Sequence, residues 1–304
     1  MTPAPQDHSV RGLLKAGIAQ LREANVPSYT LAAELLLLSV AGRDRTWLYA
    51  HPEEIVPESS TDKYFALLDR RAAGEPTQHL TGKQEFWGLE FEVTPDVLIP
   101  RPETEHLIEV ALDRLAVREV RAGRPPRLTG ENVTLVDVGT GSGCIAIALA
   151  KELPAATVYA TDISPATLNI AQRNAARLGF ANRIQFIESN LFEALSSLAF
   201  DLVISNPPYV SRRDAHSLSV EVREHEPPLA LYGGEEGFEF YADLISQAQR
   251  YIKPSGLFVL ELGYDSLPAV RPLLDDSTWA NVGVTNDLAG IPRVLSAERL
   301  PITR

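Results

Sequence analysis

Cysteine is almost absent from this chain. A single cysteine among 304 residues excludes a disulfide framework and a metal cluster built from cysteine thiolates. The 6 histidines supply no pair with the spacing that places two metal ligands on one helix face. The sequence therefore predicts no metal centre, and its 45% of apolar residues must supply a core that stabilises the fold.

Long apolar runs and clustered positive charge are also lacking. The longest apolar run, residues 31–41, is about half of a membrane span and contains Glu34. Residues 1–11 lack the apolar core of a secretion signal, so we expect a soluble, cytoplasmic protein without a membrane partner. The net charge is −12, and neither residues 1–90 nor residues 91–304 are basic overall. This charge argues against a broad nucleic-acid surface, so we expect no DNA partner.

The chain begins with a helical segment. Apolar residues at helical spacing predict four helices, at residues 10–21, 31–40, 45–50 and 60–73. Ser28 is a candidate N-cap of the second helix, and Gly42 is its expected C-cap. No catalytic constellation occurs here. We therefore predict that residues 1–82 form a small helical domain for substrate recognition.

The next segment, residues 83–130, changes character. Apolar and polar residues alternate around Gly88, which predicts a hairpin. A helix is then expected from Pro102, which suits the first helical position, to about Val117. Residues 118–132, with their arginine, glycine and proline, are expected to form an exposed connector.

From residue 131 onward, strands and helices alternate, which is typical of an α/β domain with a parallel sheet. Strands are expected at residues 134–138, 157–161, 184–188, 202–205, 257–262, 281–286 and 293–296. Helices are expected at residues 144–153, 165–178, 237–252 and 267–274. The last two strands are predicted to pair as a hairpin around Gly290. Residues 131–304 should therefore form a mostly parallel sheet with an antiparallel C-terminal strand.

A glycine loop joins the first of these strands to its helix. It consists of Gly139, Thr140, Gly141, Ser142 and Gly143. Its glycines allow backbone N–H groups to approach a ligand, and an acid that follows the second strand can accept hydrogen bonds from ribose hydroxyls. That acid is Asp162. The alternatives are a tight turn for the loop and a helix-capping role for the acid.

The loop differs from two other nucleotide-binding patterns. A dinucleotide fingerprint requires a third glycine where this chain has Cys144, and the lysine of a P-loop is missing. Gly-x-Gly-x-Gly followed by Asp162 resembles the S-adenosylmethionine-dependent methyltransferases. For Cys144, a contact between helix and sheet is favoured over a thiol with a lowered pKa at the helix start.

A second motif, Asn206-Pro207-Pro208-Tyr209, follows the fourth predicted strand. Residues before proline avoid the helical region, and proline has no N–H to donate. The motif therefore offers two acceptors, the Asn206 side-chain oxygen and the Pro207 carbonyl, with Tyr209 as an aromatic wall. Such a ledge fits a planar group with an NH2, either a carboxamide or the amine of a base. Taken alone, the motif favours an ordinary Asn-Pro turn that buries Tyr209, and only the glycine loop upstream reverses this preference.

The two motifs together resemble amino-group methyltransferases. Two branches use this tetrapeptide: DNA adenine methyltransferases, and glutamine methyltransferases that act on peptide chain release factors. The whole chain resembles the second branch, the HemK/PrmC type. The residues that carry this resemblance are 74–82, 86–91, 98–105 (Leu-Ile-Pro-Arg-Pro-Glu-Thr-Glu), 226–234 and 287–293.

The resemblance implies a Rossmann-like methyltransferase domain and a set of site residues. It places S-adenosylmethionine on residues 139–143, with Asp162 on its ribose and residues 190–192 beside its adenine. It places the substrate glutamine on residues 206–209, with Asn206 facing both ligands. Asn190 and Leu191 depart from the acid and tryptophan of some relatives, although an asparagine oxygen can still accept from the adenine amine.

The implied reaction transfers a methyl group to the side-chain nitrogen of the glutamine in a release factor's Gly-Gly-Gln motif, leaving S-adenosylhomocysteine. We assign Asn206, Pro207 and Tyr209 to catalysis and no residue as a general base. We expect the enzyme to be a monomer. The main alternative is a DNA adenine-N6 methyltransferase, which would hold a flipped adenine on the same ledge. The other is a cofactor-binding protein without activity.

Overall fold

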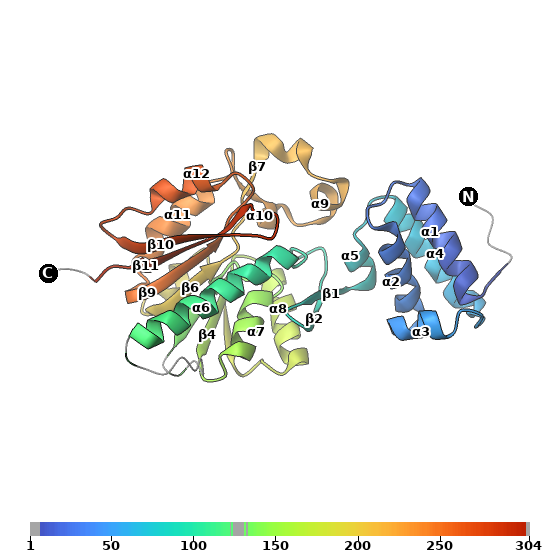
Figure 1. Ribbon diagram of the computed structural model, residues 1–304, viewed down its shortest axis with the longest axis horizontal. Helices are drawn as coiled ribbons and strands as arrows, with labels where there is room; N and C mark the ends of the chain where they lie inside the picture. The colour runs from blue at the N-terminus through green and yellow to red at the C-terminus, as the bar shows by residue number, and fades with distance from the viewer. Residues whose placement is uncertain (1–6, 122, 124–130, 132, 302–304) are drawn as a thin grey trace. The chain divides into compact units, whose positions relative to one another are not determined.

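The computed structural model describes residues 7–121, 123, 131 and 133–301, and it divides the chain into two compact units. One unit contains the chain up to Lys83 together with Ser219–His225, and the other contains Gln84–Leu218 and Glu226–Arg304 (Figure 1). In the described ranges, no helix is long and apolar enough to cross a membrane. The division of the sequence into domains at residues 82 and 130 stays a proposal.

The first unit is a bundle of helices. Its elements before the hairpin are α1 (Val10–Glu23), α2 (Tyr29–Ala41), α3 (Arg45–Ala50), α4 (Glu58–Ala72) and α5 (Thr77–Thr81). Helix α2 lies at its centre because Ala33, Leu36 and Leu37 are fully buried. Gly42 takes the left-handed conformation and ends α2, as predicted. Ser28 occupies the N-cap position of α2, as predicted, but its side chain makes no capping bond.

A later segment of the chain also belongs to this unit. Helix α9 (Val220–His225) lies in Ser219–His225. The buried guanidinium of Arg71 pairs with the Glu221 carboxylate. The sequence did not predict this helix, because a six-residue segment with one buried ion pair has no apolar period of its own.

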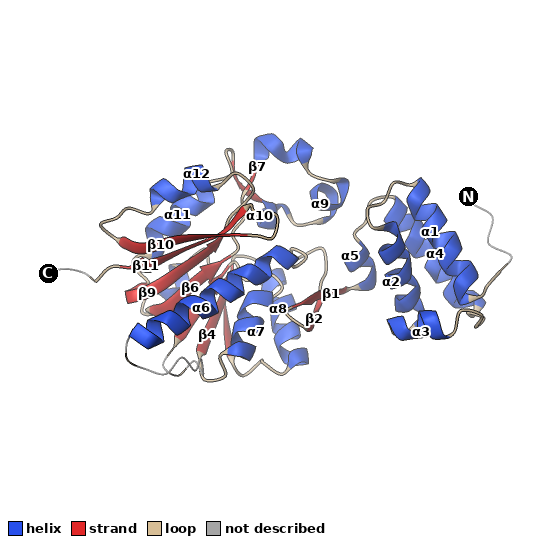
Figure 2. Ribbon diagram, in the orientation of Figure 1, coloured by secondary structure: helices blue, strands red, loops and turns tan. Residues whose placement is uncertain are grey.

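The second unit is built on a seven-stranded sheet. Its strands are β3 (Thr134–Val138), β4 (Thr157–Asp162), β5 (Ile184–Glu188), β6 (Phe200–Ser205), β9 (Ile252–Glu261), β10 (Trp279–Asn286) and β11 (Pro292–Arg299). The order is β10-β11-β9-β6-β3-β4-β5, and only β11 runs antiparallel to both neighbours (Figure 2). The order reverses between β3 and β6, which is where ligands bind in such sheets. The predicted parallel sheet and terminal hairpin are confirmed.

Helices cover both faces of the sheet. They are α6 (Glu105–Arg121), α7 (Cys144–Glu152), α8 (Pro165–Leu178), α11 (Glu239–Ala248) and α12 (Leu267–Val270). Successive β3 side chains enter different cores, because strand side chains alternate between faces. Leu135 packs with α6, α7 and α8, whereas Val136 packs with α11 and α12. The sheet is therefore buried on both sides, and polar groups reach solvent mainly at the strand ends.

Three predicted boundaries differ from the structure. Helix α6 continues to Arg121, past the expected end at Val117, and Arg118 binds Asp201 at 2.5 Å. The remaining residues of the expected connector lie mostly outside the described residues. Helix α11 ends at Ala248, and Ile252 starts β9 instead of ending a helix, since it pairs with Phe200 of β6. Pro272 interrupts the last helix, which continues as the 3-10 turn η4 (Arg271–Leu273).

Short elements complete the second unit. The predicted hairpin is present as β1 (Lys83–Phe86) and β2 (Leu89–Glu92), with Gly88 at a positive φ. The 3-10 turn η1 (Pro102–Thr104) precedes α6, with Pro102 at its first position. Elements that were not predicted are η2 (Glu193–Leu195), β7 (Val210–Ser211), η3 (Arg212–Ser217), α10 (Pro228–Leu231) and β8 (Tyr232–Gly234).

Candidate active site

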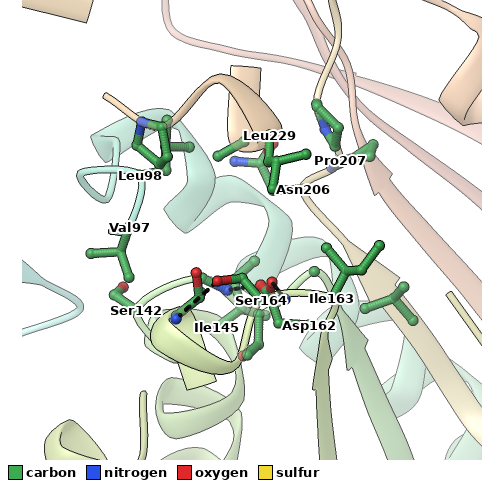
Figure 3. Close-up of a pocket in the computed structure, with 18 of the residues that line it drawn as sticks. Val97, Leu98, Ser142, Ile145, Asp162, Ile163, Ser164, Asn206, Pro207 and Leu229 are labelled. Carbon is green, nitrogen blue, oxygen red and sulfur yellow. Dashed lines mark hydrogen bonds between the residues drawn. The ribbon is translucent and has the colours of Figure 1, made fainter. Parts of the chain in front are cut away.

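A cavity of about 430 Å³ opens at the carboxyl ends of β3, β4 and β6. Ten predicted site residues line it: Gly139, Thr140, Gly141, Ser142, Asp162, Asn190, Leu191, Asn206, Pro207 and Pro208. Figure 3 shows Asn206 and Pro207 on one side and Ser142 and Asp162 on the other. The volume is in the range of sites that enclose small cofactors. Gly143 and Tyr209, which were also predicted, are not in the lining.

The glycine loop is folded by its own backbone. Gly139, Gly141 and Gly143 all have positive φ angles, which side chains rarely tolerate. The Gly139 and Thr140 N–H groups both donate to the Thr161 carbonyl, at 2.9 and 2.8 Å. A Cβ on Gly143 would lie 3.1 Å from the Ala171 Cβ, so this glycine permits α7 to approach α8. The loop that follows β3 is thus hydrogen-bonded to β4, and its third glycine allows α7 and α8 to pack closely.

Asp162 is the last residue of β4, and its carboxylate is hydrogen-bonded to the glycine loop. Its Oδ2 accepts from the Gly141 N–H and its Oδ1 from the Ser164 N–H, both at 3.0 Å. Burial raises the pKa of this carboxyl, although both bonds oppose the shift. The N-cap of α8 is Ser164, which accepts from the Thr167 N–H. The alternative in which Asp162 caps that helix is therefore wrong.

Asp137 is an acid that the sequence analysis missed. It is fully buried in β3, and its Oδ2 accepts from the Thr140 hydroxyl at 2.6 Å and the Ala146 N–H at 3.2 Å. Its Oδ1 is buried and has no hydrogen-bond partner among the described residues. Burial raises the pKa of Asp137 to about 7, and the Asp162 charge adds to the shift. Asp137 could have been found from the sequence, because it is a single acid within the otherwise apolar strand Thr134–Val138.

Asn206 follows the last residue of β6 and is held in one orientation. Its Nδ2 donates to the hydroxyl of the buried Thr104 at 3.1 Å, which leaves Oδ1 as an acceptor. Pro207 and Pro208 follow in the cavity lining and have no N–H groups to donate. This arrangement is compatible with the acceptor ledge predicted from the sequence, which stays a prediction.

Tyr209 lies behind this ledge. A Cβ on Gly263 would lie 2.6 Å from the Tyr209 Cδ2, so the ring rests against the glycine backbone. Burial, and then the nearby Glu261 charge, raise the pKa of Tyr209 to about 12. The ring packs against the core on the α11 side of the sheet. The structure thus brings Tyr209 to the ledge without making it the aromatic wall of the cavity.

Two further segments line the cavity and were not predicted as site residues. They are residues 95–98, 100 and 101 in one segment and residues 227, 229 and 230 in the other. Arg101 binds Glu226 through Nη2 and Oε1 at 2.5 Å. The Ile99 N–H also donates to Glu226 Oε2, at 3.3 Å. This ion pair joins the two segments, and its two residues both belong to the stretches that carried the family resemblance.

Cys144 begins α7 beside the loop. It is 7% exposed and packs in the core with Ile145 and Ala146. Burial raises the pKa of its thiol to about 12, so the sulfur is neutral at physiological pH. The packing interpretation is favoured, and the alternative of a lowered pKa is wrong.

Comparisons with known proteins agree with this geometry. Two family models match: the PrmC N-terminal domain at residues 12–82 and the methyltransferase small domain at residues 126–223. The catalytic domain of hMettl16 aligns over 78% of this chain and 84% of its own, with 18% identity and a TM-score of 0.54. This likeness supports the methyltransferase fold.

Curated relatives match along nearly the whole chain. The release factor glutamine methyltransferase of Koribacter versatilis is 44% identical over 281 residues, which cover 92% of this chain and 95% of the relative. The protein of that name from Burkholderia pseudomallei is 42% identical, covering 94% of this chain and 97% of its own. The one from Bradyrhizobium diazoefficiens is 38% identical over 99% of this chain and 100% of its own. The chain therefore belongs to the release factor glutamine methyltransferase family.

Proposed function

We propose that the protein transfers a methyl group from S-adenosylmethionine to the side-chain nitrogen of the glutamine in a release factor's Gly-Gly-Gln motif. This modification would modulate translation termination. The observation that carries the proposal is the orientation of Asn206, whose Nδ2 is bound to Thr104 while Oδ1 is left as an acceptor. A glutamine side chain carries the planar NH2 that such an acceptor fits.

The cavity suits the cofactor in charge and in hydrogen bonding. S-adenosylmethionine supplies an electrophilic methyl group on a sulfonium and carries an ammonium. Asp137 and Asp162 provide two carboxyls at the loop, and Asp137 Oδ1 has no hydrogen-bond partner in the part of the chain that the structure describes, which favours a cationic ligand. Asn190 donates its Nδ2 to Glu193 at 3.0 Å, so its Oδ1 remains to accept from an adenine amine. We therefore assign the residues 139–143, Asp162, Asn190, Leu191 and Asn206 to this cofactor.

The protein's catalytic contribution is positioning and electrostatics. An amide nitrogen is a poor nucleophile because its lone pair is delocalised. Acceptors at Asn206 Oδ1 and the Pro207 carbonyl would fix the plane of the substrate amide and polarise its N–H bonds toward them. The nitrogen gains the methyl group and then releases one proton to solvent, so no protein base is required. Tyr209 supports the ledge from behind.

Glutamine fits this arrangement better than asparagine. The ledge lies inside a cavity, and a substrate backbone must stay outside it. A side chain shorter by one methylene would leave the nitrogen out of place, and misplacement on the scale of an ångström costs about 10²-fold in rate. Glycines before the glutamine let the substrate backbone approach closely. We propose that residues 1–82 hold the rest of the release factor.

A DNA adenine would offer the same NH2 to the ledge, but the net charge of −12 disfavours a polyanionic substrate. The test is incubation with methyl-labelled cofactor, a purified release factor and a DNA duplex in one reaction. Label should enter the release factor and not the DNA. Label confined to the DNA would overturn the proposal.

A further inference from the structure

Glu261 is a buried acid beside Asn206 that the mechanism above does not use. It is the last residue of β9, and its neighbour Leu260 pairs with Ser205 of β6. Asn206 directly follows Ser205, so Glu261 and Asn206 lie at adjacent strand ends. Glu261 is 1% exposed, and its Oε2 has no hydrogen-bond partner among the described residues. Burying such a carboxyl is costly, which calls for a reason.

Thr104 links Glu261 to Asn206. Its hydroxyl accepts from the Asn206 Nδ2 at 3.1 Å and lies near the Glu261 carboxyl, whose pKa it lowers. Thr104 is 2% exposed, so water does not compete for its hydroxyl. A hydroxyl has one hydrogen to donate. An ionised carboxylate only accepts, so the Thr104 hydrogen must point to Glu261, and its oxygen must accept from Asn206.

We propose that Glu261 is a positioning residue that sets the orientation of the Asn206 amide through the Thr104 hydroxyl. The ionised carboxylate accepts the one hydrogen bond that the Thr104 hydroxyl can donate. The Thr104 oxygen can then only accept a hydrogen bond, and within the Asn206 amide only Nδ2 can donate one. Oδ1 is thereby aimed at the substrate. This inference rests on the proposed function, since it explains why the ledge presents an acceptor instead of a donor.

The protonation state of Glu261 controls this arrangement. Burial raises its pKa to about 7, although Thr104, Arg293 and Arg101 lower it and Glu103 adds to the rise. Tyr209 and Tyr241 also face the carboxyl, since the Glu261 charge raises the pKa of both phenols. A protonated Glu261 can donate to Thr104, whose own hydrogen can then turn to Asn206 Oδ1 and favour the flipped amide. Turnover should therefore rise as pH increases through about 7.

Kinetics of Glu261→Gln test the proposal. The glutamine keeps the shape but can donate to Thr104, so kcat should fall at least about 10-fold at pH 8 while the cofactor Kd stays within about 2-fold. The rise of kcat through pH 7 should disappear. The matched control is Glu298→Gln, on β11, which pairs with Leu257 in the middle of β9 and should keep the wild-type pH profile. An unchanged kcat, or an equal loss of kcat in the control, would overturn the proposal.

A double-mutant cycle tests the route through Thr104. Thr104→Val removes the hydroxyl at similar volume and should lower kcat, and Thr104→Ser should restore most of that loss. Adding Glu261→Gln to Thr104→Val should cost almost nothing more, because the carboxylate then has no hydroxyl to act through. If the losses of kcat in the two single variants multiply in the double variant, Glu261 does not act through Thr104.

A readout without substrate separates this inference from the proposed function. In protein labelled with 15N at asparagine, the Asn206 side-chain amide signal is identified by its loss in Asn206→Ala. It should shift with an apparent pKa near 7 in the wild type and not in Glu261→Gln. A signal insensitive to pH in both proteins would refute the inference even if glutamine methylation is found, and a titrating signal would support it even if methylation is absent.

Discussion

Arg101 and Glu226 lie 125 positions apart in the chain, yet Arg101 Nη2 is 2.5 Å from Glu226 Oε1. The Glu226 side chain is 1% exposed, whereas that of Arg101 is 30% exposed. The pair holds the segment that precedes Thr104 against the segment that enters α10. It therefore stabilises two walls of the cavity and the partner of Asn206 together.

Removal of the arginine should destabilise the protein because it leaves a buried carboxylate without its cation. Arg101→Met is expected to lower the free energy of unfolding by about 3 kcal/mol, measured by urea denaturation. Arg173→Met breaks a more exposed pair with Glu92 and should cost no more than about 1 kcal/mol. Equal effects of the two variants would show that Glu226 is solvated or partnered elsewhere.

Asp162 should contribute mainly to cofactor affinity. Asp162→Ala removes a charged acceptor for ribose hydroxyls and the brace on Gly141, so binding should weaken by about 1.5–3 kcal/mol. Isothermal calorimetry with S-adenosylmethionine measures the change, with Asp276→Ala as an exposed control. Unchanged affinity would remove Asp162 from the cofactor site.

Asn206 should contribute mainly to turnover. Asn206→Ala leaves the loop and Asp162 intact, so much of the cofactor affinity should remain, while kcat falls at least about 10²-fold with loss of the oriented acceptor. Single-turnover rates at saturating cofactor and release factor measure this effect. A variant with normal rates would show that the ledge does not hold the substrate nitrogen.

Cofactor binding should release protons near neutral pH. The folded-state pKa of Asp137 is raised to about 7 by burial, so its stabilising contribution is present at acid pH and is lost as pH rises through 7. A bound cation lowers this pKa, and the carboxyl then loses its proton. Calorimetry at pH 7 in buffers of different ionisation enthalpy should detect the release, and Asp137→Asn should diminish it. Uptake of protons on cofactor binding would contradict the proposal that Asp137 stabilises a cationic ligand.

The parts of the site that depend on neighbouring residues could be predicted from the sequence. The loop at residues 139–143 and Asp162 belong to one strand-loop-helix-strand unit, where local glycine and proline chemistry determines the backbone. The strand before Asn206 and its two prolines are equally local. The sheet followed from the alternation of strands and helices, since parallel strands require crossover connections.

The remaining features depend on contacts between distant segments. Tyr209 packs on Gly263, and Asn206 binds Thr104, which is 102 positions away. No periodicity or residue spacing in the sequence predicts these two contacts. Glu261 looked like one more residue of an apolar strand until the register placed it beside Asn206. The start of β9 at Ile252 was missed because residues 253–256, Lys-Pro-Ser-Gly, have the composition of a loop and the apolar run begins only at Leu257.

Mass spectrometry of a release factor treated with the enzyme and S-adenosylmethionine tests the central claim most directly. Fragment ions locate the added mass, and release factors with Gln→Asn and Gly→Ala changes in the Gly-Gly-Gln loop serve as matched substrates. We predict one added methyl on the side chain of the wild-type glutamine and little on either variant. Equal methylation of the asparagine variant would contradict the argument that a shorter side chain cannot bring its nitrogen to the ledge. No methylation of the wild-type glutamine would contradict the account as a whole.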